Sequence, residues 1–221
     1  MIVAHRGLHT AAPENSVAAF VAAANAGMSW VECDVWPSSD NFAVVIHDPT
    51  LERTTGKPGE VRKHTLAQLQ QMGLPSLDDV VAALNELSAP GLAVEIKPRI
   101  NRLFVESVMK SLAGYDGIRM VQSFHDDNLV RVWGIENSMH TAMLVDSAED
   151  MKKAIERGWP FINAHYPLVD AELVQRLHST GRRIGAWTVN EPEDIRRMVG
   201  LGIDMLITDD PILARDISAS R

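Results

Sequence analysis

Cysteine is almost missing from the 221-residue sequence, which contains only Cys33. A single thiol can form neither an intrachain disulfide nor a cysteine-based zinc cluster, so a disulfide-rich secreted scaffold and a zinc-finger domain are both excluded. Positive charge is also in short supply, with 21 Lys and Arg against 29 Asp and Glu and a formal net charge of -8. Proteins that follow nucleic-acid phosphates need clustered Lys and Arg, so we expect no nucleic-acid partner.

Long apolar runs are missing too. No stretch approaches the ~18 consecutive apolar residues of a membrane span, and no basic, apolar leader precedes the first expected strand at Ile2. We therefore expect no transmembrane segment and, by default, a cytoplasmic protein. With 46% hydrophobic and 23% charged residues the composition is that of an ordinary globular chain. Because the sequence contains no linker and no second core pattern, we expect one domain over residues 1–221, and nothing in it indicates an oligomeric state.

Short runs typical of β-strands alternate with longer helical patterns, in which apolar residues recur at i, i+3 and i+4. Such alternation predicts a parallel sheet, and repeated strand-helix units in 221 residues predict a single closed (β/α)₈ TIM barrel. An open doubly wound sheet is the alternative, but the G-x-G-x-x-G loop that usually follows its first strand is absent. The expected strands are residues 2–6, 30–35, 92–97, 119–124, 141–146, 161–165, 183–189 and 204–208, and the expected helices are residues 16–27, 76–87, 102–113, 126–134, 147–158, 170–181 and 191–202.

An additional strand-like run, AVVIHD at residues 43–48, follows the second strand after the turn-rich connection PSSDN. This spacing predicts a β-hairpin extension after strand two of the barrel. Residues 49–75 are then the only long stretch that reads as irregular, and a loop of that length on a compact barrel is usually functional.

Polar side chains collect where the first three expected barrel strands and the hairpin end. Active sites of TIM barrels lie at the carboxyl ends of the strands, and residues two apart in a strand point to the same face. We therefore expect these side chains to meet at one rim, whereas chance would distribute them over both ends. They are His5 and Arg6 of strand one, Glu32 and Asp34 of strand two, His47 of the hairpin, and Glu95 and Lys97 of strand three.

The acidic residues at this rim predict a divalent cation. Without a cation between them, the carboxylates of Glu32, Asp34 and Glu95 would repel one another, which would raise their pKa values and weaken the fold. Mg²⁺ or Ca²⁺ suits ligation by oxygen alone and leaves positions open for a phosphate. Zn²⁺ ranks lower because it would be expected to recruit histidine directly.

The other rim residues predict chemistry on a phosphodiester. Arg6 can hold phosphate oxygens with its planar guanidinium, and Lys97 can act on them as a point charge. His5 and His47 arrive from different strands, and an ordinary pKa near ~6.5 suits both for proton transfer at neutral pH. The set predicts a metal-dependent phosphodiesterase with two histidines as acid and base.

A series of short motifs follows in order from one end of the chain to the other. They are AHRG (4–7), PENS (13–16), ECD (32–34), HD (47–48), RTTG (53–56), EIK (95–97), QSF (122–124), WTVN (187–190) and TDDP (208–211). This series resembles the glycerophosphodiester phosphodiesterase family. The resemblance implies a TIM barrel, a divalent metal, and hydrolysis of a small glycerophosphodiester to glycerol 3-phosphate and an alcohol. It also implies the roles already reached from charge: His5 and His47 as the acid/base pair, Glu32, Asp34 and Glu95 as metal ligands, and Arg6 and Lys97 as phosphate contacts.

The resemblance implies a reaction route, and the sequence departs from the family pattern in two places. In the route usually drawn for the family, the 2-hydroxyl of glycerol attacks phosphorus to form a cyclic phosphate, which water then opens. Trp187 can stack against the glycerol or the leaving group, or belong to the core. Residues 37–41 replace the turn that the family often has there, without changing an expected ligand. The segment after His47 is short, which would leave a roomier and less selective mouth than in relatives with an inserted subdomain.

Three other functions are open at this point. A related metal-dependent lipid phosphodiesterase of the lysophospholipase D type would use the same groups, because headgroup specificity lies in loops. A Schiff-base lyase could use Lys97 as its amine, although the neighbouring carboxylates would keep that amine protonated. A barrel that binds a phosphodiester or a partner without turnover is the third, and the complete set of acid, base and metal-binding groups argues against it.

Overall fold

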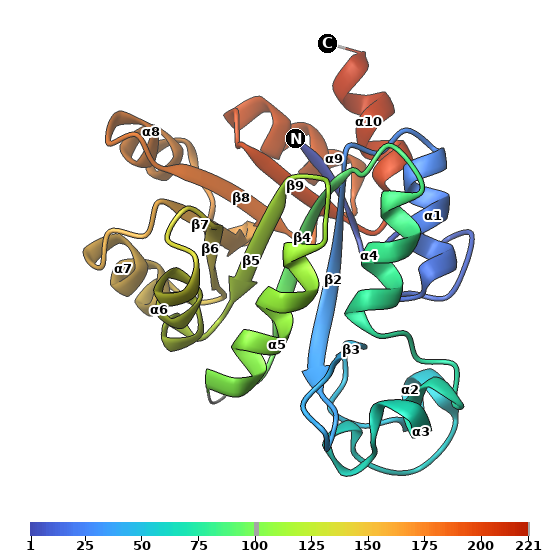
Figure 1. Ribbon diagram of the computed structural model, residues 1–221. Coiled ribbons are helices and arrows are strands. Elements are labelled where there is room, and N and C mark those ends of the chain that lie inside the picture. Colours follow the sequence, from blue (N-terminus) through green and yellow to red (C-terminus); the bar gives the residue numbers. More distant parts are fainter. Residues whose placement is uncertain (100–101, 221) are drawn as a thin grey trace.

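The computed structural model describes residues 1–99 and 102–220, and its centre is a closed barrel of parallel strands (Figure 1). Within these residues, eight parallel strands pair in the order β1-β2-β4-β5-β6-β7-β8-β9, and β9 pairs in turn with β1. An open doubly wound sheet has two free edges, so the β1–β9 pairing excludes it and the predicted TIM barrel is confirmed. The strands are β1 (Ile2–His5), β2 (Trp30–Pro37), β4 (Gly91–Ile96), β5 (Arg119–Ser123), β6 (His140–Val145), β7 (Phe161–His165), β8 (Arg183–Trp187) and β9 (Met205–Thr208).

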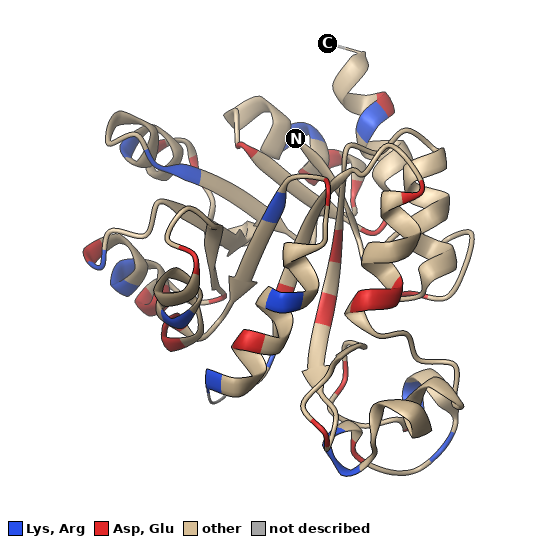
Figure 2. Ribbon diagram, viewed as in Figure 1, with Lys and Arg blue, Asp and Glu red and all other residues tan. Residues whose placement is uncertain are grey.

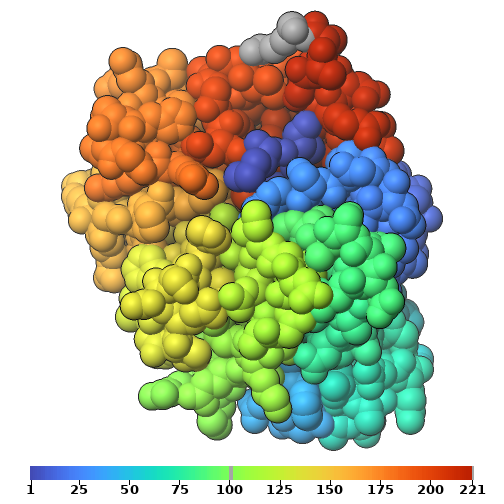
Figure 3. All heavy atoms as spheres, turned by 45° about the horizontal axis from the view of Figure 1, so that its top comes forward, coloured from blue at the N-terminus to red at the C-terminus, as the bar shows by residue number. Residues whose placement is uncertain are grey.

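Helices surround the barrel, and in the space-filling view the colours of the sequence follow one another around the molecule (Figure 3). The expected helices form, and four of them start at a side-chain cap, at Ser16, Ser76, Ser147 and Asp170. At Ser76, for example, the hydroxyl accepts from the backbone N–H of Asp79, and the Asp79 carboxylate accepts from that of Ser76. An additional helix, α10, was not expected, although Asp210 caps it and Pro211 opens it. The helices are α1 (Val17–Asn25), α4 (Leu77–Asn85), α5 (Arg102–Ala113), α6 (Asp126–Ile135), α7 (Ala148–Glu156), α8 (Ala171–Ser179), α9 (Pro192–Leu201) and α10 (Pro211–Ala219). Among the described residues, none of the helices has the length and apolar character needed to cross a membrane.

The interior of the barrel changes from apolar to acidic along β2. Trp30, near the amino end of the strand, packs against β4, where a Cβ at Gly91 would come within 2.3 Å of the indole. Glu32 and Asp34 follow on the same face of the strand, and the acidic bands along β2 are visible in Figure 2. An apolar cluster inside the barrel consists of Val3, Trp30, Ala93, Met120, Ala142, Phe161, Met205 and Ile207.

The segment after β2 forms an extension at the carboxyl end of the barrel (Figure 1). Strand β3 (Ala43–Val45) runs antiparallel to β2, as the expected hairpin requires. The expectation of a long irregular loop over residues 49–75 is wrong, because this stretch contains α2 (Glu52–Thr55), a 3₁₀ turn (Val61–Lys63) and α3 (Leu66–Gln70). These short elements pack around an apolar cluster of their own, made of Val44, Ile46, Leu51, Val61, Leu69 and Leu74.

Candidate active site

One cavity lies at the carboxyl end of the barrel and gathers the side chains expected there. Asp34 is fully buried beside it and contacts both Arg6 and Lys97. The other expected site residues all line the cavity, namely His5, Arg6, Glu32, His47, Glu95, Lys97 and Trp187, and Gln122 and Phe124 join them.

Glu32, Asp34 and Glu95 form a buried carboxylate triad, in which one oxygen from each residue lies within 4.8 Å of the others. The residues are 1%, 0% and 6% exposed, respectively. Burial and then repulsion from Asp34 raise the pKa of Glu95 to about 8, and burial, Asp34 and Glu95 raise the pKa of Glu32 well above its ordinary value. Burial would also raise the pKa of Asp34, but Lys97 and Arg6 hold it at about 2. The triad therefore concentrates negative charge that nearby cations offset only in part.

Arg6 and Lys97 supply that partial compensation. Arg6 Nε lies 3.1 Å from Asp34 Oδ2, and Lys97 Nζ lies 3.2 Å from Asp34 Oδ1 and 3.1 Å from Glu95 Oε1. Burial would lower the pKa of Lys97, but the carboxylates of Asp34 and Glu95 outweigh it and the pKa is raised. Lys97 is thus an ammonium at neutral pH, which suits contact with a phosphate and opposes formation of a Schiff base.

Two oxygens of the carboxylate triad fit the needs of a cation. Asp34 Oδ1 and Glu95 Oε1 are buried, and within residues 1–99 and 102–220 neither accepts a hydrogen bond. Each of these oxygens pairs with Lys97 Nζ, whose single charge is shared between two carboxylates. Buried charged oxygens without donors are costly unless a cation compensates them. All the ligand atoms that the triad offers to a metal are carboxylate oxygens, so the triad fits Mg²⁺ or Ca²⁺.

A left-handed turn after β1 places backbone and side-chain donors against the other triad oxygens. Arg6 and Gly7 have φ of 56° and 82°, and a Cβ at Gly7 would lie 2.7 Å from the backbone of Ala19 in α1. Glycine therefore allows α1 to approach this closely. The Arg6 N–H donates to Glu32 Oε2 at 3.2 Å, and Asn15 Nδ2, just before α1, donates to Asp34 Oδ2 at 2.8 Å. The AHRG and PENS motifs thus orient two of the three carboxylates.

His5 is held by a carboxylate from the far end of the sequence. Its Nδ1 lies 2.6 Å from Asp209 Oδ1, in the loop after β9. His9 Nε2 approaches the same oxygen at 3.0 Å, and Asn190 Nδ2 donates to Asp209 Oδ2 at 2.7 Å. With Nδ1 engaged, Nε2 is the nitrogen of His5 that is left for chemistry in the cavity.

His47 is held in the same way by its neighbour in sequence. Its Nδ1 lies 2.7 Å from Asp48 Oδ1, and Asp48 Oδ2 accepts from Arg53 Nε in α2. Arg53 Nη2 also donates to Glu14 Oε1 at 2.7 Å, and Glu14 pairs with Arg6. Burial, which outweighs the effect of Asp34, lowers the pKa of His47, so its neutral form is favoured at physiological pH.

Trp187 belongs partly to the barrel framework and partly to the cavity wall. Its indole N–H donates to the backbone carbonyl of Asn163 at 2.9 Å, and its ring meets that of Phe124 edge to face, with centroids 5.5 Å apart. Asn163 Nδ2 donates to Gln122 Oε1 at 2.9 Å, and Gln122 Nε2 donates to Glu32 Oε1 at 3.1 Å. A chain of polar contacts therefore runs across the barrel from beneath Trp187 to the carboxylate triad.

Several of these polar groups received no role from the sequence. Among them, Asp209, Arg53 and Gln122 lie within the motifs TDDP, RTTG and QSF. For Asp209 and Gln122 a usable signal existed, because both lie near the carboxyl end of an expected strand, where a barrel places its site. Arg53 lies in a short helix that the sequence did not predict.

Comparison with known proteins places the chain in a family. The sequence profile of the "Glycerophosphoryl diester phosphodiesterase family" matches residues 5–213. A glycerophosphodiester phosphodiesterase of Caldanaerobacter subterraneus subsp. tengcongensis is 28% identical over 230 residues, which cover 96% of this chain and 94% of the relative. One from Bacillus altitudinis is 29% identical over 231 residues, with coverage of 95% and 94%.

Known structures share the whole fold. A phosphodiesterase of Oleispira antarctica, solved in complex with the product sn-glycerol-3-phosphate, superposes with a TM-score of 0.89 at 24% identity and covers 98% of this chain and 96% of its own. A glycerophosphodiester phosphodiesterase of Thermotoga maritima gives a TM-score of 0.83 at 25% identity, with coverage of 98% and 97%. This chain belongs to the glycerophosphoryl diester phosphodiesterase family and is an enzyme of the phosphoric diester hydrolase class.

Proposed function

We propose that this enzyme hydrolyses glycerophosphodiesters to glycerol 3-phosphate and an alcohol, within one domain over residues 1–221. One observation carries the proposal: carboxylate-held imidazoles, two cations and the carboxylate triad meet at a single cavity. The product bound to the relative from Oleispira antarctica is consistent with glycerol 3-phosphate as a product here.

The carboxylate triad is the proposed site of one divalent cation, Mg²⁺ or Ca²⁺. When bound, such a cation supplies positive charge that neutralises phosphate oxygens during the reaction. Glu32, Asp34 and Glu95 would be its ligands. Asn15 and Gln122 keep Asp34 and Glu32 in place through the hydrogen bonds described above.

Proton transfer is assigned to the Nε2 atoms of His5 and His47. The 2-hydroxyl of the glycerol attacks phosphorus and gives its proton to one imidazole, while the other imidazole protonates the departing alkoxide. Water then opens the cyclic phosphate with the two imidazoles in exchanged roles, so both return to their starting protonation states. Arg6 and Lys97 hold the phosphate, and Trp187 contacts the glycerol or the alcohol.

Two of the alternative functions differ from the proposed one, the first in its product and the second in the state of Lys97 that it requires. A lysophospholipase D activity would release phosphate-bearing lipid from a lysophospholipid with the same groups. A lyase would need Lys97 as a neutral amine, which its two carboxylate contacts oppose.

A substrate panel tests the proposed function. Glycerophosphocholine, glycerophosphoethanolamine, lysophosphatidylcholine and an analogue whose glycerol lacks the 2-hydroxyl would be incubated with the enzyme and Mg²⁺ or Ca²⁺. We expect enzymatic detection of glycerol 3-phosphate from the first two and no cleavage of the analogue, because the nucleophile is missing. Cleavage of lysophosphatidylcholine alone would favour the lipid phosphodiesterase, and cleavage of the analogue at a normal rate would contradict the cyclic route.

Replacing Lys97 with methionine is expected to raise KM and lower kcat together. The ammonium faces the phosphate in both the ground state and the transition state, so its loss weakens both. A hydrogen bond to a charged group contributes ~1.5–3 kcal/mol, so kcat/KM should fall by about 10–10²-fold. The matched control is Lys152→Met, because Lys152 is 76% exposed on α7. An unchanged KM in the Lys97 variant would place the phosphate elsewhere.

A further inference from the structure

The loop after β9 places one carboxylate between two imidazoles. Asp209 Oδ1 lies 2.6 Å from His5 Nδ1 and 3.0 Å from His9 Nε2. On the other side, Asn190 Nδ2 donates to Asp209 Oδ2 at 2.7 Å, and Asn190 Oδ1 accepts from the backbone N–H of Asp209 at 3.0 Å. Asp209 is therefore fixed through its backbone and through both carboxylate oxygens.

The protons in this group can be placed from the chemistry of its members. Burial would raise the pKa of Asp209, but the hydrogen bonds from His5, His9 and Asn190 hold it well below its ordinary value. The group is thus a carboxylate, which only accepts hydrogen bonds. Both imidazoles must present an N–H to Oδ1, His5 through Nδ1 and His9 through Nε2. In a neutral His5 the lone pair is then on Nε2, the nitrogen available to the cavity.

We propose that Asp209 is the positioning residue for His5, and that His9 and Asn190 hold Asp209 in the orientation that this requires. The inference rests on the proposed role of His5 in proton transfer. Asp209 fixes the tautomer and the ring plane of His5, and its charge stabilises the imidazolium that forms when Nε2 takes a proton. His9 is thereby part of the site.

The carboxylate partners of His5 and His47 are held by different groups. Asp48, the partner of His47, is bound by the guanidinium of Arg53. Around the Asp209 carboxylate, the hydrogen-bonding partners that the described residues provide are two imidazoles and the side-chain amide of Asn190. With no Arg or Lys paired to it among these residues, the charge of Asp209 is directed mainly at His5 and His9.

Asp209→Asn tests the proposal because an amide side chain accepts hydrogen bonds only at its one oxygen, whereas the carboxylate accepts at both. In one orientation the amide oxygen faces the imidazoles, and the amide NH₂ group then faces the side-chain NH₂ group of Asn190. In the other orientation the amide NH₂ group faces the N–H groups of both imidazoles. Either arrangement disturbs His5, and we expect kcat to fall by about 10–10²-fold, the usual effect of removing such a supporting group. KM, the thermal midpoint and the affinity for Mg²⁺ by calorimetry should stay close to those of the unsubstituted enzyme. In ¹⁵N NMR spectra, the fraction of His5 in the Nδ1–H tautomer should fall.

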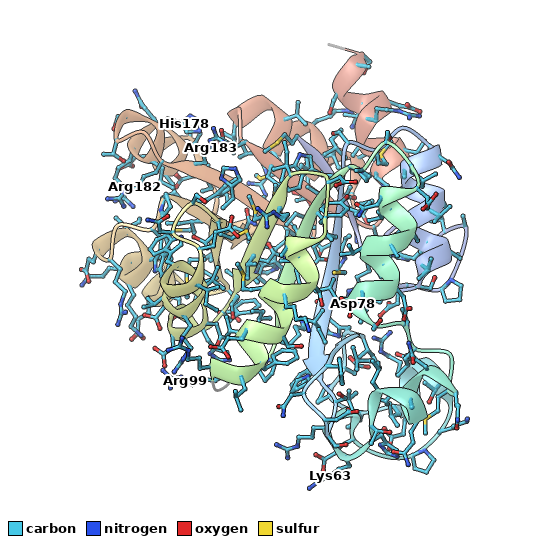
Figure 4. The ribbon with its side chains drawn as sticks, in the orientation of Figure 1. Lys63, Asp78, Arg99, His178, Arg182 and Arg183 are labelled. Carbon is cyan, nitrogen blue, oxygen red and sulfur yellow. The ribbon has the colours of Figure 1, made fainter. Side chains whose placement is uncertain are left out.

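The matched control is Asp204→Asn at the opposite end of β9. Asp204 Oδ2 lies 2.9 Å from His178 Nε2, and His178, on α8 at the upper left of Figure 4, does not line the cavity. This variant should lose stability without losing kcat. A second pair, His9→Ala and His9→Gln, should show a several-fold loss of kcat for alanine and recovery for glutamine, whose side chain can still donate to Oδ1.

The outcomes separate this proposal from the proposed function. If His5→Ala is inactive while Asp209→Asn keeps wild-type kcat and the Nδ1–H tautomer, the positioning role is overturned. A loss in Asp209→Asn that matches the fall in its thermal midpoint, as in the Asp204 control, overturns it too. If His5→Ala itself keeps near-wild-type turnover, the proposed function fails at that residue instead.

Discussion

Alanine at either His5 or His47 is expected to lower kcat by about 10²–10⁴-fold, the contribution typical of one general acid or base. Cleavage of a phosphodiester requires removal of a proton from the attacking hydroxyl and delivery of one to the leaving alkoxide. His5 and His47 are the histidines that line the cavity among the described residues, and each is bonded through Nδ1 to a carboxylate outside the triad. Calorimetry should therefore find the affinity for Mg²⁺ or Ca²⁺ little changed in both variants.

A substrate with a nitrophenyl leaving group distinguishes the acid from the base. Such a leaving group departs without a proton, so it should rescue the variant that lacks the general acid and leave the other variant slow. His178→Ala serves as the control, because this exposed histidine also has an aspartate partner but does not line the cavity. Equal rescue of both variants, or near-normal turnover of glycerophosphocholine by either, would show that the two-histidine assignment is wrong.

Exhaustive chelation is expected to abolish turnover, and addition of Mg²⁺ or Ca²⁺ to restore it. The three buried carboxylates of the triad have only Arg6 and Lys97 as nearby cations in the described structure. Full activity after chelation would contradict the assignment of the triad as a metal site. Glu32→Gln should weaken metal affinity, while its stability in chelator should stay level or rise because one source of repulsion is gone.

The chelated enzyme should also lose stability as the pH rises through neutrality. The pKa of Glu95 is about 8 in the folded protein against an ordinary 4.5, so the folded state holds this proton more tightly than the unfolded state. The resulting stability is complete below about 4.5 and is lost as the pH rises toward 8, a fall of about 2–4 kcal/mol in the free energy of unfolding. Denaturant titrations from pH 5 to about 8 would measure it. Glu95→Gln should remove most of this slope, and the exposed control Glu172→Gln should keep it.

Asp34 acts in the opposite direction at low pH. Its pKa is about 2 in the folded protein against an ordinary 3.8, so its contribution to stability is complete above 3.8 and is lost as the pH falls toward 2. The chelated protein should consequently be most stable between these two losses, in mildly acidic solution. Bound Mg²⁺ or Ca²⁺ should flatten the alkaline slope, because the cation favours the ionised form of Glu95.

The sequence predicted the barrel and the residues of the rim because both follow from local pattern. Residues two apart, such as Glu32 and Asp34, share a face of a strand whatever the rest of the chain does, and the alternation of strands and helices is repeated along the chain. The carboxyl end of a parallel barrel then brings separate strands to one place. Knowledge of the architecture was therefore enough to expect that Glu95 on β4 would meet Asp34 on β2.

The supporting contacts could not be predicted in this way, because they depend on side-chain geometry across the barrel. Asp209 and His5 are 204 positions apart, and nothing in the TDDP motif specifies an imidazole as its partner. The contact between Gln122 and Glu32 crosses the interior and requires the tilt of the closed strands. In the extension, α2 and α3 are only four and five residues long, so neither contains enough turns for a helical period to be recognised.

Because β9 pairs with β1, the last strand of the barrel completes the surroundings of His5. During synthesis, the carboxylates of β2 and β4 leave the ribosome well before β9, so the triad can assemble while the barrel is still open. Closure of the barrel then joins Ala4 to Thr208 and brings Asp209 beside His5 in the same step. Joining segments so distant in sequence is entropically expensive and slow compared with forming local helices. The carboxylates of the triad thus come from early strands, whereas the hold on His5 depends on the last strand of the barrel.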